Sequence, residues 1–200
     1  PLVLMHGNFG SWMHWIRNVE ELSRHFRVIA VDMPGFGDSA LPPEPYSTQS
    51  ISEIIAAGIL EIAGGGEITV VGFSFGGANA LETANTLGER TRKLILVSTS
   101  RTLGITHPPS PGGLVKWRGL ETRAERDAAH RHNLELVMIS QPSRVDDLAI
   151  TIQRTNTERS RLRSAVARKN ASAPASVAEL KHPVGFIWAE NDASIGAYMH

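Results

Sequence analysis

The sequence predicts an α/β protein in which a mostly parallel sheet is flanked by helices and carries an inserted helical cap. Three observations lead to this fold class. Apolar, β-branched runs alternate with helical patterns through the first hundred residues, an order typical of parallel sheets with right-handed crossovers. The run at 68–71 passes through Gly-Phe-Ser-Phe-Gly directly into a helical pattern. After residue 100 mainly helical segments fill the interval before another apolar run at 184–188, which indicates a cap inserted between two strands.

Individual elements follow from apolar periodicity and from start and stop signals. Strands are expected at 1–5, 26–31, 68–71, 93–97 and 184–188. Helices are expected after Ser11 as an N-cap, after Ser50 or Ser52, and from Gly76 to a C-cap at Gly88. Helical segments of the cap are expected at 123–132, 134–139, 145–153 and 158–168. The predicted domains are a first core part over 1–100, a cap over 101–172 and a second core part over 173–200.

The overall composition excludes several classes of protein. The chain has 200 residues and a formal net charge of zero, which gives no sign of a nucleic-acid or membrane-surface partner. It has no cysteine, which excludes a disulfide scaffold, a thiolate zinc site and a cysteine nucleophile. Neither a membrane-spanning apolar run nor a signal peptide is visible. We expect a cytoplasmic protein that acts on a small-molecule substrate without nucleic acid, membrane or metal, and a homodimer is compatible with this interpretation.

The pattern Gly35-x-Gly37-x-x-Ala40 after a strand is similar to a dinucleotide-binding fingerprint. That fingerprint requires a helix to open on the glycines and to hold the pyrophosphate at its N-terminus. Here Leu-Pro-Pro-Glu-Pro follows at 41–45, and this run cannot form the first turns of such a helix. We therefore expect no nicotinamide or flavin cofactor.

The pentapeptide Gly72-Phe-Ser74-Phe-Gly76 matches G-x-S-x-G between a predicted strand and a predicted helix. A serine on so sharp a turn must adopt a strained backbone, and the two glycines remove side chains that would collide there. The turn lifts Ser74 Oγ above the sheet, where the start of the helix offers N–H groups and a positive dipole end. We expect Ser74 to be a nucleophile. The alternative is a glycine-rich strand–helix junction with an incidental serine.

An activated serine needs donors for the oxyanion, an acid and a base. The N–H of Phe75 is one expected oxyanion donor because it follows the nucleophile in the turn. The second donor is expected from the loop after the first strand, most simply the N–H of Asn8, with Phe9 as the fallback.

The expected acid is Asp192, which follows the last predicted strand. Side chains at the ends of parallel strands point into the crevice outside the carboxyl edge of the sheet. Asp192 also follows Ser74 in the order serine, acid, histidine. Glu190 is the competing carboxylate, and Asp32 lies at another strand end.

No histidine of the sequence fits the role of base. The serine–acid–histidine order requires it after Asp192, where only His200 stands, too close for a return helix and a strand. His6 belongs to the oxyanion loop and is expected to be structural. His130 and His132, two apart on a predicted helix, do not share a face and make a poor metal pair. We expect the proton acceptor to lie outside this sequence, and this chemistry needs no cofactor or metal.

Four motifs in order resemble the α/β-hydrolase superfamily: His6-Gly7, the loop Asp-Met-Pro-Gly-Phe-Gly-Asp-Ser at 32–39, Gly-Phe-Ser-Phe-Gly-Gly at 72–77, and Trp-Ala-Glu-Asn-Asp at 188–192. The resemblance covers nearly the whole chain and implies the α/β-hydrolase fold. In relatives two strands precede the first one here, and the catalytic histidine follows a further strand. The resemblance therefore implies a chain truncated at both ends. The serine nucleophile argues against haloalkane dehalogenases and epoxide hydrolases, which carry aspartate there.

Within the superfamily the chain looks most similar to the meta-cleavage-product hydrolases, which break a carbon–carbon bond in vinylogous dienol acids. Segments 12–18 and 142–154 carry this resemblance, and Arg154 falls where those enzymes place a substrate-binding arginine. Phe73 and His14 stand where those enzymes usually have asparagines that serve polar recognition. Together with Phe9, these residues form the expected substrate pocket. An aromatic Phe73 suits a more apolar pocket, so an esterase of aryl or acyl esters is the first interpretation.

Three functions stay open at this point. The first is hydrolysis of a small-molecule ester through an acyl-enzyme on Ser74. The second is C–C bond hydrolysis of an anionic dienol substrate, and the third is a hydrolase-like binding protein without turnover. Residues 101–170 hold thirteen of the twenty basic side chains and seven of the twenty acidic ones. This excess indicates solvated helix faces and ion pairs or, alternatively, one or two arginines that receive an anionic substrate.

Overall fold

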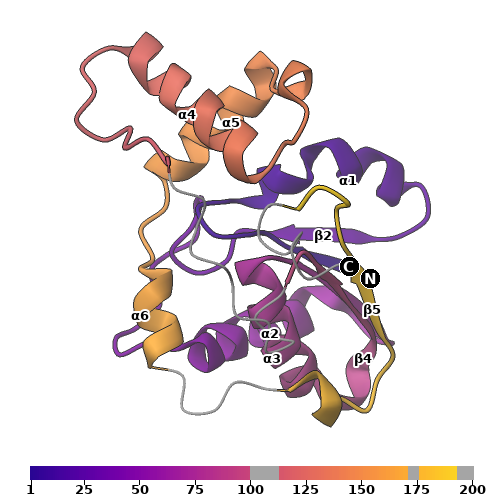
Figure 1. Cartoon of the computed structure of the whole chain (residues 1–200). Coiled ribbons are helices and arrows are strands. Elements are labelled where there is room, and N and C mark those ends of the chain that lie inside the picture. Colours follow the sequence, from indigo (N-terminus) through magenta and orange to yellow (C-terminus); the bar gives the residue numbers. More distant parts are fainter. Residues whose placement is uncertain (100–112, 171–175, 193–200) are drawn as a thin grey trace.

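The computed structural model describes residues 1–99, 113–170 and 176–192, and it confirms the predicted fold class. The described strands form one sheet in the order β2-β1-β3-β4-β5, in which every pairing is parallel. Their bounds are β1 Leu2–Met5, β2 Val28–Val31, β3 Ile68–Phe73, β4 Thr91–Val97 and β5 Val184–Ile187. Because all of these strands run the same way, the loops that follow them meet at one edge of the sheet (Figure 1).

The two faces of the sheet are covered by different helices. Val3, Val70 and Leu94 face α2 (Thr48–Ala63) and α3 (Phe75–Leu87), and they belong to the main hydrophobic core. Leu4 and Val71 point the other way, toward α1 (Ile16–Ser23), in a smaller cluster. Figure 1 shows α2 and α3 on one side of the sheet and α1 on the other. The alternation of side chains along each strand therefore produces a three-layer core domain.

The starts of two helices differ from the expectation. The helix after β1 opens with a 3-10 turn, η1 (Trp12–Trp15), for which Ser11 is indeed the N-cap, and α1 follows from Ile16. The prediction that Ser50 or Ser52 begins α2 is wrong, because Ser47 is its N-cap. Ser47 and Ser50 form a reciprocal capping box, in which each side chain accepts a hydrogen bond from the backbone N–H of the other.

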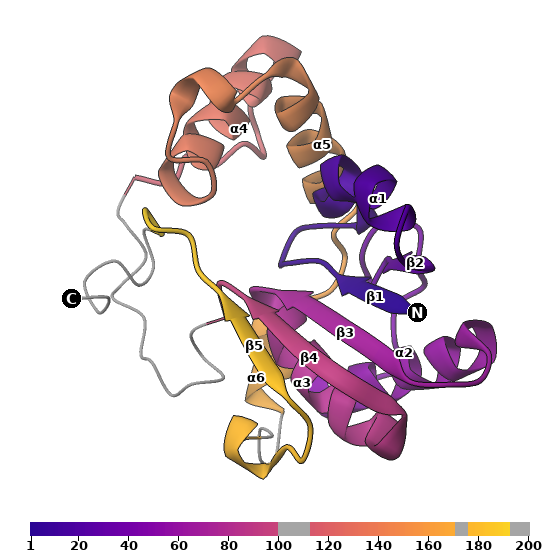
Figure 2. The same ribbon diagram turned by 90° about the vertical axis from the view of Figure 1, so that its right-hand side faces the viewer.

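The cap consists of two longer helices with their own apolar cluster. They are α4 (Arg123–Val137) and α5 (Asp147–Glu158), which pack through Leu134, Val145 and Ile150. The separate segments expected at 123–132 and 134–139 are one continuous helix up to Val137. In Figure 2 both helices lie apart from α2 and α3, beyond the same side of the sheet as α1.

A third helix of the predicted cap range packs on the core domain. The segment expected as a helix over 158–168 is helical only at α6 (Ser164–Lys169). Before it, the N–H groups of Arg161 and Leu162 both donate to the carbonyl of Gly35, and these bonds replace a helical ladder. Leu162 and Ala167 then belong to the main core cluster. The other short 3-10 turns of the described ranges are η2 Gly88–Arg90, η4 Pro142–Arg144 and η5 Val177–Glu179. Among the helices of the described ranges, none combines the length and the hydropathy that crossing a membrane requires.

Candidate active site

Strained backbone marks the carboxyl edge of the sheet. Within the described ranges, the non-glycine residues with left-handed backbone are Phe9 (φ 53°), Ser74 (φ 53°) and Ser98 (φ 44°). Phe9 lies in the loop after β1, Ser74 directly follows β3, and Ser98 directly follows β4. These three strands are neighbours in the sheet. Strain of this kind persists only where the surrounding structure enforces it, and it clusters at functional sites.

Ser74 has the backbone of a nucleophile elbow. Ser74 stands between the last residue of β3 and the first residue of α3, and its backbone angles are φ 53° and ψ −116°. Its N–H donates to the Val97 carbonyl of β4 at 2.9 Å, and its carbonyl accepts from the Gly77 N–H at 2.9 Å. The side chain is half-buried, and Oγ makes no hydrogen bond with a described residue. The turn therefore holds the serine firmly by its backbone and leaves its hydroxyl available.

The flanking glycines are required by close packing. A Cβ on Gly72 would lie 2.5 Å from the Gly76 carbonyl oxygen and 2.6 Å from the Gly77 Cα. A Cβ on Gly76 would lie 2.6 Å from the Met5 carbonyl oxygen and nearer still to that of His6. Real Cβ atoms do not approach backbone this closely, so α3 can pack on β3 at Gly72 and on the end of β1 at Gly76 only because these residues have no side chain.

The loop after β1 packs against Phe73 and Ser74. A Cβ on Gly7 would lie 2.8 Å from the Phe73 ring and 3.4 Å from Ser74 Cβ. Asn8, which follows, is half-buried, and its Oδ1 is buried without a hydrogen-bond partner in the described structure. Phe9 is exposed, with a relative accessibility of 49%. The residues expected to donate to an oxyanion thus come from two segments, the Gly7 loop and the start of α3 at Phe75.

His6 has the structural role that was expected. It is fully buried, its Nδ1 donates to the Gly7 carbonyl at 2.8 Å, and its Nε2 accepts from the Met33 N–H at 3.1 Å. Burial lowers its pKa to about 4, so the ring is neutral at pH 7. With both nitrogens engaged, His6 joins the loop after β1 to the loop after β2.

His14 is held in a single neutral form beside Phe73, the residue before Ser74. Its Nδ1 accepts the Gly7 N–H at 3.3 Å, and its ring meets the Phe73 ring edge-on at 5.8 Å. Burial, together with the nearby His6, lowers its pKa to about 3. Because Nδ1 is an acceptor, the proton of the neutral ring is on Nε2, which is buried without a partner in the described structure. His14 is therefore a poor proton acceptor for Ser74 and presents an unused donor.

Asp32 is occupied by the loops around it. Its carboxylate accepts the Trp12 N–H at 2.7 Å and the Asp38 N–H at 3.0 Å. A Cβ on Gly37 would collide with the same carboxylate, which explains that glycine in the loop after β2. The glycine pattern at 35–40 thus serves a tight loop. The next helix, α2, begins only at Thr48 and not on these glycines.

Asp192 follows β5 at the same sheet edge. Its N–H donates to the Ala189 carbonyl at 3.0 Å, which closes a turn, and the residue is half-buried, whereas Glu190 is exposed. The Ser98 N–H donates to the Ile187 carbonyl at 2.9 Å, and this bond ties the end of β5 to the end of β4. The Ser74 N–H likewise donates to the Val97 carbonyl at the end of β4. Ser74 follows β3 and Asp192 follows β5, and these are the two strands on either side of β4.

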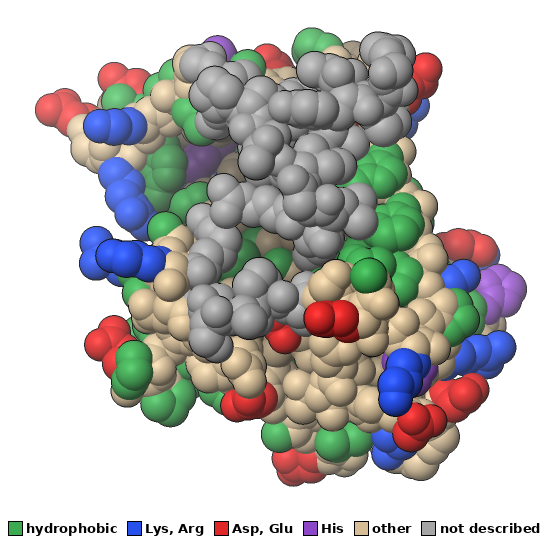
Figure 3. Space-filling view, turned by 60° about the horizontal axis from the view of Figure 1, so that its bottom comes forward, with side chains coloured by type: hydrophobic (Ala, Val, Ile, Leu, Met, Phe, Trp, Pro, Cys, Tyr) green, Lys and Arg blue, Asp and Glu red, His purple; other side chains and the backbone are tan. Residues whose placement is uncertain are grey.

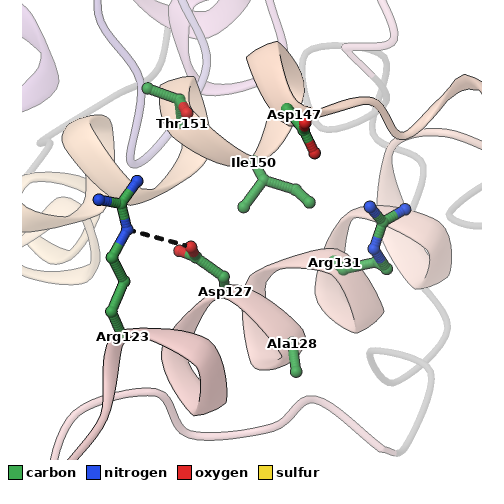
Figure 4. Close-up of a pocket in the computed structure, with 7 residues that line it drawn as sticks. All are labelled: Arg123, Asp127, Ala128, Arg131, Asp147, Ile150 and Thr151. Carbon is green, nitrogen blue, oxygen red and sulfur yellow. Dashed lines mark hydrogen bonds and ion pairs between the residues drawn. The ribbon is translucent and has the colours of Figure 1, made fainter.

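Arg154 lies on α5 of the cap and is already paired. Its guanidinium binds the carboxylate of Asp127 on α4, and its side chain is 15% exposed. Asp127 also contacts Arg123 at 3.4 Å. Beside this cluster a hollow of about 520 Å³ opens between α4 and α5, with Arg123 pointing toward Asp127 (Figure 4). An anionic ligand of Arg154 would have to compete with Asp127 for the guanidinium.

Other charged groups are dispersed. On the face in Figure 3 acidic and basic side chains are interspersed around the edge of the molecule. Across the ranges 1–99, 113–170 and 176–192, no group of three or more His, Asp or Glu side chains has a geometry that would hold a metal ion.

One residue of interest was not predicted from the sequence: Asn156 of α5, whose side chain accepts a hydrogen bond from Ser11 at 2.6 Å. No local pattern announces a contact between residues 145 positions apart.

Comparison with known proteins agrees with this geometry. A family model described as the alpha/beta hydrolase fold matches residues 1–193. The 2-hydroxymuconate semialdehyde hydrolase of Pseudomonas sp. strain CF600 is 33% identical over 120 residues, which are 58% of this chain and 41% of that protein. The pimeloyl-acyl-carrier-protein methyl ester esterase of Pseudoalteromonas atlantica is 33% identical over 102 residues, which are 49% of this chain and 36% of that protein. The aligned regions thus span about two fifths of these curated relatives.

A solved structure supports the fold over a larger share. The meta-cleavage product hydrolase of Pseudomonas fluorescens IP01 superimposes with a TM-score of 0.71 at 23% identity, over 98% of this chain and 74% of that chain. The predicted likeness to meta-cleavage-product hydrolases within a wider group of esterases is confirmed by these relatives. With a family model matched along nearly its whole length, a glycine-flanked elbow at Ser74 and a parallel sheet beneath it, the chain belongs to the α/β-hydrolase family.

Proposed function

We propose that this chain carries the nucleophile and the acid of a serine hydrolase that cleaves a small-molecule ester through an acyl-enzyme on Ser74. The observation that carries the proposal is the left-handed backbone of Ser74 on the turn between β3 and α3, with its hydroxyl unbonded among described residues. A strained serine of this kind, held against a glycine loop from a neighbouring strand, is the arrangement that acyl transfer requires.

The proposed reaction assigns one role to each group. Ser74 Oγ attacks the ester carbonyl, and the N–H groups of Asn8 and Phe75 donate to the oxyanion that forms. A histidine that follows Asp192 in the chain, beyond the described residues, takes the serine proton and returns it to the leaving alcohol. Asp192 orients that histidine. Water then attacks the acyl-enzyme in the reverse sense, releasing the acid and regenerating Ser74.

An ester is favoured over a dienol acid by the pair Phe73 and His14. Their rings meet edge-on at 5.8 Å next to Gly7, so the wall beside the nucleophile is largely aromatic. In the proposed pocket Phe9 adds a further exposed aromatic side chain at the sheet edge. An aryl or acyl group packs on such a wall without leaving charged groups unpaired.

C–C bond hydrolysis of an anionic dienol substrate is the second candidate. It is supported by the 33% identity to a protein named as a hydrolase of 2-hydroxymuconate semialdehyde, and by Arg154 in the cap. In this proposal Arg154 binds the substrate carboxylate after releasing or sharing Asp127. The competing carboxylate makes this candidate the weaker of the two.

Pre-steady-state kinetics of the full-length protein separates the candidates. With a 4-nitrophenyl acyl ester we expect a burst of one nitrophenolate per active site followed by steady turnover, both abolished in Ser74→Ala. A ring-fission dienol acid serves as the competing substrate. A higher kcat/KM for the dienol acid than for every aryl ester would establish the C–C reaction instead. Stoichiometric binding without turnover of either substrate would make the protein a hydrolase-like receptor.

A further inference from the structure

A buried hydrogen bond joins the cap to the loop beside the nucleophile. Asn156, near the end of α5, is fully buried, and its Oδ1 accepts the Ser11 hydroxyl proton at 2.6 Å. Ser11 is itself 1% exposed. The ion pairs Arg17–Asp146 and Arg159–Asp38, which also join the cap to the core domain, are exposed by contrast. A buried hydrogen bond holds its geometry more strictly than an exposed ion pair, because water cannot replace either partner.

Ser11 fixes the turn that carries His14. Its Oγ accepts the Met13 N–H at 3.2 Å as the N-cap of η1, and its carbonyl accepts the His14 N–H at 3.0 Å. A serine hydroxyl can donate one hydrogen bond and accept others at the same time. Ser11 therefore donates to Asn156 Oδ1 and accepts from the Met13 N–H. The bond to Asn156 thereby fixes the rotamer of the Ser11 side chain. As the N-cap of η1, Ser11 in turn fixes the position of His14 in that 3-10 turn.

His14 passes this position on to the Gly7 loop. The Gly7 N–H donates to His14 Nδ1, and the imidazole ring lies so close over Gly10 that a Cβ there would be 2.6 Å from Nδ1. Gly7 in turn lies against Phe73 and Ser74. The contacts from Asn156 through Ser11, His14 and Gly7 are thus continuous from the cap helix to the nucleophile.

We infer that Asn156 and Ser11 are positioning residues, through which the seated cap sets the oxyanion loop of the catalytic site. The inference rests on the proposed function, because the loop matters for turnover only if Ser74 is acylated. Its consequence is that the cap contributes to the rate of acylation and not only to the choice of substrate. A displacement of the loop by a fraction of an ångström is enough, since donors must meet the developing oxyanion at hydrogen-bond distance.

The test compares Asn156→Ala, Ser11→Ala and the double variant of the full-length protein, with Arg159→Gln as the matched control. Arg159→Gln breaks a cap–core contact that does not touch the loop. We expect the labelling rate of Ser74 by a fluorophosphonate probe to fall about tenfold to hundredfold in each single variant. The double variant should be no slower than the slower single one, because both remove the same bond. kcat on an aryl ester should fall while KM stays within about twofold.

A second readout does not depend on activity. The ring nitrogens of His14, assigned with a His14→Gln sample, should give ¹⁵N signals of one neutral form with the proton on Nε2. In Asn156→Ala the Nδ1 signal should move, whereas Arg159→Gln should leave it unchanged. Unmoved His14 signals, or independent and additive losses in the double variant, would overturn the inference. A wild-type protein that never reacts with the probe would refute the proposed function, and the His14 signals would then decide the inference alone.

Discussion

The region around Ser74 and the cap obtain their structures from different kinds of interaction. Around Ser74 the backbone has little freedom, because added side chains at Gly72 or Gly76 would collide with neighbouring main chain. In the cap, α4 and α5 meet through a small apolar cluster and through charged groups, with Asp127 contacting two arginines. Main-chain packing admits one arrangement, whereas ion pairs tolerate exchange of partners. In the proposed function, backbone sterics would therefore fix the position of the nucleophile, and the preference for a substrate would depend on replaceable side chains of the cap.

The largest expected effect comes from disrupting the main-chain packing around Ser74. In Gly76→Ala the new Cβ would meet the carbonyl oxygens of Met5 and His6, which are main chain and cannot swing away. We expect a loss of about 3 kcal/mol in the free energy of unfolding, measured by urea titration. Gly58→Ala is the control, because Gly58 lies in α2 with nothing within 4 Å of an added Cβ. That variant should gain about 0.5–1 kcal/mol. Equal losses in both variants would contradict the steric account.

The second-largest expected effect is a loss of folding stability in acid, which arises from the two buried histidines near Ser74. The folded pKa values of His6 and His14, about 4 and about 3, lie below the usual 6.5, so the unfolded chain binds more protons between pH 4 and 6.5. The folding stability that these two neutral histidines contribute is fully present above pH 6.5 and is lost as the pH falls toward 4. Lowering the pH from 7 to 5.5 should cost about 2 kcal/mol in the urea-derived free energy of unfolding.

His14→Gln should remove about half of this pH dependence, and the same substitution at exposed His25 serves as the control. An unchanged pH dependence in His14→Gln would show that His14 is not buried as a neutral ring.

The smallest expected effect concerns the cap. Arg154→Gln should raise KM about tenfold for an ester bearing a carboxylate and leave KM for a neutral ester unchanged, since only the first would need the guanidinium. Asp127→Asn should do the opposite for the carboxylate substrate, because it removes the competing anion. Steady-state kinetics with a matched pair of esters measures both. Equal changes for the two esters would mean that Arg154 only holds α4 and α5 together.

Much of the core domain follows from local patterns. The strands at 68–71 and 93–97, the elbow at Ser74 and the C-cap at Gly88 were predictable, because each depends on neighbours within a few residues. The start of α2 was misplaced because three serines compete there, and the capping box between Ser47 and Ser50 decides the choice. Residues 159–163 were predicted as helix because their pattern is locally helical. The Gly35 carbonyl, far along the chain, takes two of their N–H groups instead.

The site was predictable where it depends on the backbone and not where it depends on distant partners. Ser74 and the Gly7 loop follow from glycine patterns, and Asp192 stays a prediction from chain order. The hydrogen bond from the Gly7 N–H to His14 Nδ1 forms only because the 3-10 turn that carries His14 folds back onto the preceding loop. The bonds of Asn156 to Ser11 and of Arg154 to Asp127 join segments whose spacing in the sequence carries no signal. His200, which stands too close to Asp192 to serve as the base, lies outside the described residues.

The most direct measurement is an intact-mass spectrum of the full-length protein before and after a fluorophosphonate probe, with Ser74→Ala and Ser98→Ala alongside. Ser98 also has left-handed backbone at the same sheet edge, so it controls for strain without the glycine-flanked elbow. We expect one adduct per chain in the wild type and in Ser98→Ala, and none in Ser74→Ala. An adduct that survives in Ser74→Ala, or none in the active wild-type protein, would contradict the assignment of Ser74 as the nucleophile.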